Sequence, residues 1–473
     1  MKNNAAENNA IKSNTTNNNT NENNTTNNNA KKSNFGKFML LWGGELISSI
    51  GGGLTSFGLS VYVFRMTGSA SATALVALLA FLPTLLLSVP AGVLADRMDR
   101  RLLMIIGDGC SAIGIIYILI CMLRGGATLT QICIGVTVSS IFSALLEPAY
   151  RATITDLLDK DEYTKASGIV GLAGSARYLI SPLIAGLLLA VSDISLLLMI
   201  DICTFFLTVI ATLIVRSHLE AKKEEHTTSF MADLKEGWGT VTGNRGILLL
   251  VLMTSGVTLF MGAIQILSEP MILDFADSKT LGITETVCAS GMLVSGILLG
   301  IRGIKGGYVR FLSASLCGCG IAMIFFGMRE YIPLITAAGF SFFFMLPFAN
   351  SCLDYLTRTN IPDELQGRAW GVIGFISQLG YVVAYGLFGV LADAVAGWTG
   401  QGVGRGAGIT IMVSGLIMAV IAVAISFNKD IRKLESAGLT PVGVESAGLT
   451  SVGVNATELA AVAGSGQESA VEI

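Results

Sequence analysis

Twelve long apolar runs dominate this sequence and decide what the chain can fold into. They cover residues 38–64, 71–95, 102–123, 129–150, 166–191, 194–215, 246–273, 283–304, 308–328, 331–356, 367–393 and 406–427. Each run is close to or above the ~20 residues that an α-helix needs to cross ~30 Å of hydrocarbon. Backbone groups in lipid must be hydrogen-bonded within their own segment. The sequence therefore predicts an all-α polytopic membrane protein with twelve transmembrane helices.

Composition agrees with lipid as the solvent and excludes several classes of function. Only 13% of the 473 residues are charged and 55 are Gly, whereas soluble domains carry roughly 25% charged residues and less Gly. The net charge of −3 argues against a nucleic-acid partner, because phosphate binding needs a basic face. With two His and no Walker A sequence, we expect no metal, no cofactor and no enzymatic activity.

A long polar stretch divides the spans six and six. We predict a disordered Asn/Thr-rich tail, a six-helix bundle, a solvated cytoplasmic linker, a second six-helix bundle and a disordered tail, at residues 1–34, 35–215, 216–245, 246–427 and 428–473. Lys and Arg concentrate in the tails and in alternate loops, and cytoplasmic loops are the ones enriched in these residues. Both termini should therefore be cytoplasmic, in the cell membrane.

An internal repeat links the fourth and tenth spans. Glu147 precedes Arg151 by four residues, and Asp354 precedes Arg358 by four; both acids (354 − 147) and both arginines (358 − 151) are 207 residues apart. Residues four apart share a helix face and can pair. Each pair is either an ion pair at a helix end, part of a gate-closing network, or, through Glu147 and Asp354, a direct handler of substrate or protons. Such duplication is common in transporters.

The loop after the second span carries a ten-residue motif, Gly92-Val-Leu-Ala-Asp96-Arg97-Met-Asp-Arg100-Arg101. It resembles the signature of the major facilitator superfamily, and this resemblance implies two six-helix bundles around a central cavity. It also implies that Asp96 pairs across helices, with Arg151 as the expected partner, and so closes the cytoplasmic side. Gly92 would permit close helix contact. Arg97, Arg100 and Arg101 would hold the loop at the anionic leaflet.

The first five residues of this motif recur as Gly389-Val-Leu-Ala-Asp393, at the end of the eleventh span. This copy falls on the opposite side of the membrane from the first. We predict that the recurrence is coincidental.

Two further segments resemble those of exporters. The fifth span contains Ser181, Pro182, Ala185 and Gly186, which is similar to the antiporter motif G-P-x-x-G-G; the alternative is a kinked, tightly packed helix. Residues 361–368, Ile-Pro-Asp-Glu-Leu-Gln-Gly-Arg, resemble a stretch of the macrolide-efflux and enterobactin-exporter branch of the superfamily. The resemblance implies membership of that drug-efflux branch.

Charged residues inside the spans are candidate functional groups, because a charge in hydrocarbon is expensive. Glu45 lies in the first span, Glu269 in the seventh and Arg177 in the fifth. Removal from water favours the neutral form of a carboxyl group, which suits proton carriage or reading of cationic drugs. Alternatively, the Glu45 carboxyl group is hydrogen-bonded by Ser or backbone partners, and Arg177 is a counter-ion to Glu45 or Glu147.

We therefore predict a monomeric secondary transporter that exports lipophilic or cationic small molecules, such as a drug, a macrolide-like compound or a peptide natural product or siderophore, by proton antiport. An uptake symporter on the same fold and a non-transporting membrane scaffold are the alternatives. Aromatic and Met residues could form an adaptable hydrophobic pocket, although most could equally be packing or lipid-facing residues: Trp42, Phe57, Phe81, Met261, Phe340, Phe342, Phe343, Phe344 and Met345.

Overall fold

The computed structural model describes residues 34–216 and 230–437, and these residues form helices with no strand among them. Twelve stretches of this described chain are long and apolar enough to cross a membrane. This confirms the predicted all-helical class and the predicted number of spans.

The spans correspond to single helices or to pairs of helices separated by a break. In chain order they are α2 (Phe35–Thr67), α3 (Ala70–Arg97), α4 (Arg100–Leu123), α5 (Leu129–Ser143) with α6 (Leu146–Leu157), α7 (Tyr163–Leu179) with α8 (Ser181–Val191), α9 (Ile194–Arg216), α11 (Arg245–Leu273), α12 (Ser278–Arg302), α13 (Tyr308–Met328), α14 (Ile332–Arg358), α15 (Asp363–Thr399) and α16 (Val403–Phe427). Three shorter elements complete the described fold: η1 (Lys160–Glu162), α10 (Phe230–Gly243) and α17 (Lys429–Ala437).

Local sequence explains where several helices begin and end. The Asp277 side chain accepts a hydrogen bond from the Thr280 N–H at 2.8 Å and so satisfies a donor that the first turn of α12 leaves unpaired. This cap starts α12 at Ser278, five residues before the predicted span at 283–304. At the other end of a helix, Gly68 adopts φ 61° after α2, a conformation that favours Gly.

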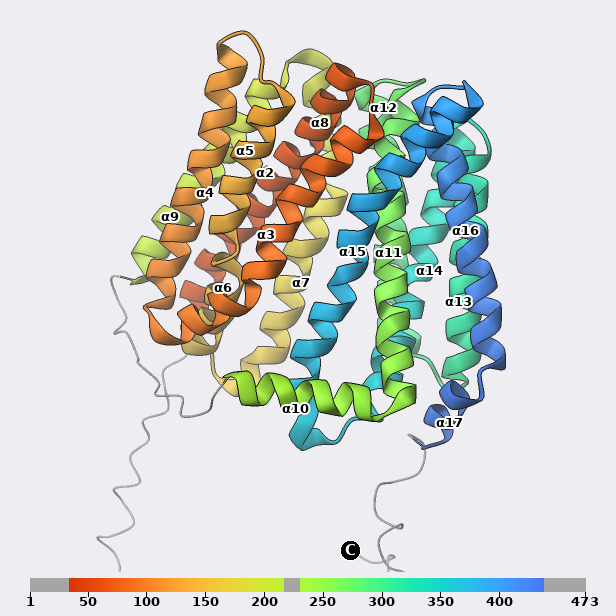
Figure 1. The fold of residues 1–473 in the computed structure, drawn as a ribbon. Helices are drawn as coiled ribbons and strands as arrows, with labels where there is room; N and C mark the ends of the chain where they lie inside the picture. Colours follow the sequence, from red (N-terminus) through yellow and green to blue (C-terminus); the bar gives the residue numbers. More distant parts are fainter. Residues whose placement is uncertain (1–33, 217–229, 438–473) are drawn as a thin grey trace, which may run out of the picture.

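The helices form two groups that stand side by side, α2–α9 and α11–α16 (Figure 1). We call the end of the helices where α10 and α17 lie the terminal side, and the opposite end, where α2 passes into α3, the far side (Figure 1). Residues 35–215 and 246–427 remain our proposal for the two bundles. A single apolar core includes buried residues of both groups, among them Leu54 and Ala185 of the first and Leu267 and Leu281 of the second.

Glycines permit close helix packing within each group. A Cβ on Gly320 of α13 would lie 2.6 Å from the carbonyl oxygen of Gly415 in α16, and a Cβ on Gly114 of α4 would lie 2.7 Å from the Ser139 nitrogen in α5. Such contacts stabilise the association of membrane helices. Lipid tails are as apolar as the side chains, so the hydrophobic effect does not drive helices together and close packing of their backbones does.

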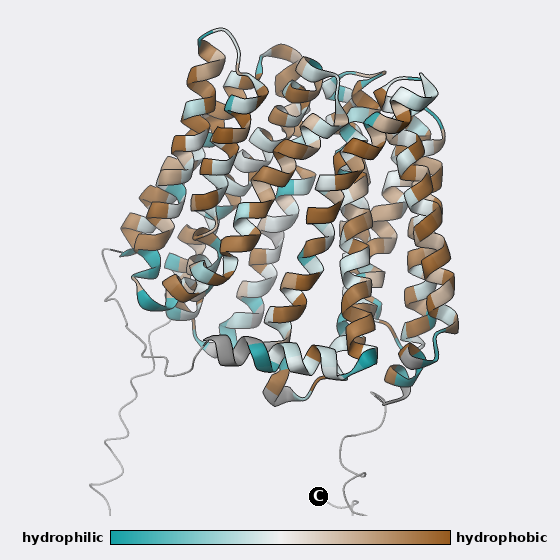
Figure 2. Ribbon diagram, in the orientation of Figure 1, coloured by the Kyte–Doolittle hydropathy of each residue, from teal (hydrophilic) through white to brown (hydrophobic). Residues whose placement is uncertain are grey.

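The outer surface is apolar along the length of the helices, and hydrophilic residues concentrate at their ends (Figure 2). Ile210, Leu416 and Val420 expose 53%, 56% and 62% of their surface. An outward-facing apolar surface of this extent matches a protein that is surrounded by hydrocarbon.

The linker and the C-terminal segment contain helices that we did not predict. Within the expected solvated linker, residues 217–229 lie outside the described part, but Phe230–Gly243 form α10, which runs along the terminal side against α15 and α11 (Figure 1). The segment 428–473, expected to be disordered, begins with α17, whose Ile431 and Leu434 are buried. Both are short amphipathic helices, a pattern that a search for long apolar runs overlooks. Residues 1–33 and 438–473 lie outside the described residues.

Candidate functional site

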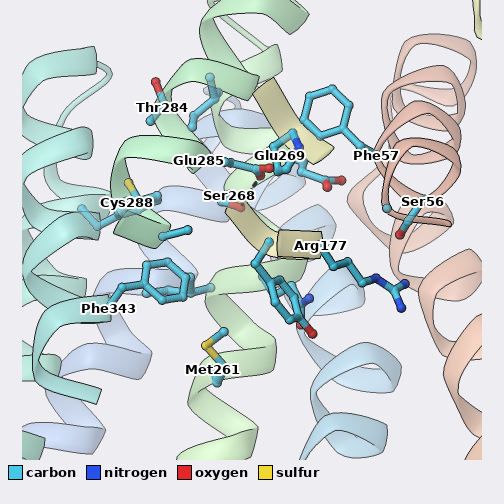
Figure 3. Close-up of a pocket in the computed structure, with 18 residues that line it drawn as sticks. Ser56, Phe57, Arg177, Met261, Ser268, Glu269, Thr284, Glu285, Cys288 and Phe343 are labelled. Atoms are coloured by element: carbon cyan, nitrogen blue, oxygen red, sulfur yellow. Dashed lines mark hydrogen bonds between the residues drawn. The ribbon is translucent and has the colours of Figure 1, made fainter. Parts of the chain in front are cut away.

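A cavity of about 150 Å³ lies between the two helix groups. Its walls come from α2, α7 and α8 of the first group and from α11, α12, α13 and α14 of the second. Because both groups contribute side chains, a relative movement of the groups would change the cavity and its access. Figure 3 shows the residues that line it.

Two carboxyl groups, those of Glu269 on α11 and Glu285 on α12, lie beside one another in this cavity (Figure 3). They are close enough to interact electrostatically. The Ser268 hydroxyl donates a long hydrogen bond of 3.5 Å to Oε1 of Glu285. We name Glu269 and Glu285 the carboxyl pair. Like charges repel in a mainly apolar environment, so two neighbouring carboxyl groups are an unusual feature of this cavity.

The rest of the cavity wall is mainly apolar. Phe57, Met261 and Phe343, three of the residues predicted to form a pocket, line it together with Ile264 and Phe326. Met adapts its shape readily and aromatic rings offer large apolar faces. Such a wall fits a lipophilic molecule without demanding one particular shape.

Other residues predicted to form the pocket pack elsewhere. The Trp42 indole Nε1–H donates to the Ile169 carbonyl oxygen at 2.8 Å. The Phe81 ring of α3 contacts the rings of Tyr381 and Tyr385 in α15, with centroids 5.7 Å and 5.9 Å away. These residues join helices and do not line the cavity.

Arg177 lines the cavity from α7, just before the break between α7 and α8 (Figure 3). It is exposed, and it interacts electrostatically with Glu45 and Asp201. The cavity thus contains a fixed positive charge as well as the carboxyl pair. Arg177 was a predicted counter-ion of Glu45 or Glu147, and the structure adds its proximity to a cavity.

Glu45 is half-buried in α2 and does not line the cavity. Its electrostatic neighbours include Glu147, Arg177 and Asp108. Proton carriage by Glu45 remains a prediction.

The two acid–arginine pairs of the internal repeat are both present on the terminal side. Arg151 pairs with Glu147 at 2.7 Å, and Arg358 pairs with Asp354 at 2.9 Å. The side chains of the first pair are 72% and 69% exposed and those of the second 56% and 49%. Exposed pairs contribute little to stability. The predicted gate-closing role of these residues would therefore require another conformation, in which the helices are arranged differently.

The motif at residues 92–101 is tied to other helices of the first group. Arg100 forms an ion pair with Asp156 of α6 at 2.9 Å, and Arg216 at the end of α9 pairs with Asp99 at 2.9 Å. The Asp99 carboxylate also accepts a bond from the Arg101 N–H at 3.1 Å, which caps α4. Asp156 and Asp99 therefore hold this loop, in which we had assigned roles to Gly92, Asp96 and three arginines but to neither of these two acids.

Asp96 and Arg97 are exposed. Arg151 pairs with Glu147 in this structure, so the predicted contact between Asp96 and Arg151 remains a prediction for a conformation with a closed terminal side. The close contact expected at Gly92 is not present here, because a Cβ on this residue would meet no atom within 4 Å. The end of α3 that carries Gly92 faces open space on that side.

The segment that resembles the antiporter motif joins the two groups on the far side. Ser181, Ala185 and Gly186 are buried, and the Ser181 hydroxyl donates to the Ile50 carbonyl oxygen at 3.1 Å. A Cβ on Gly186 would lie 3.2 Å from the Gly282 Cα in α12. The helix breaks at Ile180, directly before Ser181 and Pro182. The segment is therefore kinked and tightly packed, which agrees with the alternative that we gave to an antiporter motif.

Sequence reasoning missed Glu285 as a site residue. We predicted the eighth span at 283–304, which includes Glu285 near its start, but we did not name Glu285 as a candidate; α12 begins at Ser278 and so places Glu285 further inside the helix. The Asp277 cap was the available signal. Among the residues that the structure describes, no group of three or more His, Cys, Asp and Glu could hold a metal ion; His218 and His226 lie outside them.

The twelve spans make this a multi-pass membrane protein, and a cavity lies between its two helix groups. The family model described as Major Facilitator Superfamily matches residues 41–385. The chain belongs to this superfamily and is a transporter rather than an enzyme.

Three known proteins illustrate the similarity. Macrolide efflux protein A of Streptococcus pyogenes is 26% identical over 410 residues, which cover 84% of this chain and 97% of the relative. Multidrug efflux pump Tap of Mycolicibacterium fortuitum is 22% identical over 418 residues, 85% of this chain and 98% of the relative. Among solved structures, a bacterial homologue of the human lysosomal transporter Spinster is similar in fold, with a TM-score of 0.63 at 13% identity, and the match covers 86% of this chain and 99% of that one.

Proposed function

We propose that this protein exports lipophilic or cationic small molecules across the cell membrane by proton antiport and alternating access. The observation that carries the proposal is the carboxyl pair, Glu269 and Glu285, in an apolar cavity to which both helix groups contribute. The efflux names of two relatives, for macrolides and for multiple drugs, support export of compounds of this kind.

The carboxyl pair provides a physical basis for exchange. When the cavity is empty, proximity and removal from water favour protons on the pair. A cationic substrate beside the pair adds positive charge there and so favours release of a proton. Proton and substrate then compete for one site, and competition for a site that faces one side at a time produces antiport.

The orientation of the chain determines which direction of transport is export. The Lys and Arg residues of the terminal side, such as Arg100, Arg151 and Arg358, favour a cytoplasmic location for that side. The far side would then face outward. In this proposal the substrate enters the cavity from the terminal side and leaves when the far side opens.

The proposal is tested by measuring accumulation of lipophilic cations and macrolides in cells that express the protein, with and without a protonophore. We expect lower accumulation than in cells with an empty vector, and the protonophore should abolish the difference. The double variant Glu269→Gln, Glu285→Gln is the matched inactive control, and Asp193→Asn, in an exposed loop, is the active control. Higher accumulation that depends on the proton gradient would indicate uptake symport instead. Unchanged accumulation of every compound would contradict the proposal for these classes.

A further inference from the structure

The carboxylate of Asp393, near the end of α15, lies at the first residues of α3 in the other helix group. It accepts hydrogen bonds from the Ala70 and Ser71 N–H groups, both at 2.9 Å. It also accepts bonds from the Ser69 hydroxyl at 2.7 Å and from the Ser71 hydroxyl. One side chain thus connects the two groups through four bonds on the far side.

These partners suit a carboxylate. The first N–H groups of a helix have no partner within the helix, and the helix dipole places partial positive charge there. Hydrogen bonds from such groups to an ionised acceptor are stronger than those between neutral groups. Ser69 already caps α3 by accepting a bond from the Ala72 N–H at 3.2 Å, so Asp393 is an additional acceptor, which comes from outside the group.

One turn before Asp393, Gly389 brings the two helices into backbone contact. A Cβ on Gly389 would lie 2.6 Å from the Ala74 Cβ and 2.8 Å from the Ala70 carbonyl oxygen. Residues four apart lie on the same helix face, so Gly389 and Asp393 present one surface to α3. Gly389 allows α15 to approach α3 closely, and Asp393 makes the polar contact between the two helices.

We propose that Gly389 and Asp393 form a latch that holds the far side closed and that releases in each transport cycle. The reason is that α3 and α15 belong to groups that must separate on the far side for the cavity to open there. Asp393 is only half-buried, so water can replace its partners when the latch releases. The contact can therefore be strong in the closed state without preventing its release.

The sequence contains the same five residues at both ends of this helix pair. Gly92-Val-Leu-Ala-Asp96 ends α3 on the terminal side, and Gly389-Val-Leu-Ala-Asp393 lies near the end of α15 on the far side. We predicted that the recurrence is coincidental, and nothing in the structure tests its origin. Asp393 nevertheless bonds to α3, whereas Asp96 is exposed.

The latch is tested with a thiol introduced by Ser56→Cys, because Ser56 is exposed in the wall of the cavity. A charged, membrane-impermeant methanethiosulfonate reagent is applied to intact cells and, separately, to inverted vesicles, and modification of this thiol is quantified by mass spectrometry. If the latch holds the far side closed, Asp393→Asn should accelerate modification about tenfold or more in the orientation that exposes the far side and slow it in the other. The modification rate of the Asp393→Glu variant should remain closer to that of the protein with Asp393.

Asp193→Asn is the control, because Asp193 is an exposed acid in the loop between α8 and α9 on the same side. Equal modification of the introduced thiol with and without Asp393→Asn, in both orientations, would overturn the proposal. So would an equal acceleration by Asp193→Asn. If Asp393→Asn does not fold, Gly389→Ala tests the same contact with the same expected outcomes. The measurement does not depend on the substrate or on proton coupling, so the latch and the proposed function can fail separately.

Discussion

Gly186 of α8 lies directly against Gly282 of α12, so that a Cβ on Gly186 would come within 3.2 Å of the Gly282 Cα. The two glycines belong to different helix groups and face each other on the far side. Their contact is backbone to backbone and leaves no room for a side chain. The contacts that close the far side thus include a dry one, between α8 and α12, and a polar one, between α3 and α15.

A larger residue at Gly282 should prevent this closure. We expect Gly282→Leu to disfavour the closed far side by about 1–3 kcal/mol, the typical cost of overpacking, and to slow transport accordingly. The control is Gly296→Ala on the same helix, where a Cβ would meet no atom within 4 Å. Transport rates and unfolding temperatures are measured for both variants. Wild-type transport activity in a folded Gly282→Leu protein would show that the contact between α8 and α12 is not required.

Neutralising either member of the carboxyl pair should uncouple transport from protons. We expect Glu269→Gln or Glu285→Gln to reduce gradient-driven flux more than about tenfold, the scale on which loss of a positioned proton-transfer group acts. Glu45→Gln should have a smaller effect, because Glu45 does not line the cavity. Flux in vesicles with an imposed pH gradient measures this order, and a larger loss in Glu45→Gln would transfer the coupling role to Glu45.

Arg177 should set the charge preference of the cavity. Replacing it with Gln removes a positive charge from the wall, so affinity for a monovalent lipophilic cation should rise by about tenfold at most. Affinity for a neutral lipophilic compound of similar size should not change. Competition binding at two salt concentrations checks both statements, and unchanged cation affinity would show that Arg177 is electrostatically remote from the bound molecule.

The proposed contact between Asp96 and Arg151 predicts that exchanging the two charges restores function. Each single change, Asp96→Arg or Arg151→Asp, should lower transport, and the double exchange should recover it. Stability should change by less than about 1 kcal/mol when Arg151 alone is neutralised, because its present partner Glu147 is exposed. Losses that simply add in the double variant would argue against the pair.

The sequence was sufficient for the number and class of the spans, because the cost of unpaired backbone groups in lipid leaves long apolar runs no other regular structure. It was less informative at the ends of helices. The boundary of α12 depends on one capping carboxylate, Asp277, and an error of five residues there concealed Glu285. Short amphipathic helices such as α10 and α17 owe their stability to the helices beneath them.

Contacts between distant segments were the least predictable part. Asp393 bonds to residues that precede it by more than 300 positions, and no local pattern reports such a pairing. The same five residues at 92–96 carry an exposed Asp96. The two identical five-residue sequences therefore have different surroundings. On the far side the copy that ends in Asp393 contacts α3, whereas on the terminal side Asp96 is exposed.

Coupling between the carboxyl pair and the substrate is measured most directly with purified protein in liposomes that contain a pH-sensitive dye. Tetraphenylphosphonium, a permanent lipophilic cation that carries no proton of its own, is added outside. If the protein is an antiporter, entry of the cation should expel protons and raise the internal pH, and the double variant Glu269→Gln, Glu285→Gln should show no such rise. Cation uptake in excess of that into protein-free liposomes, with a constant or falling internal pH, would contradict proton antiport.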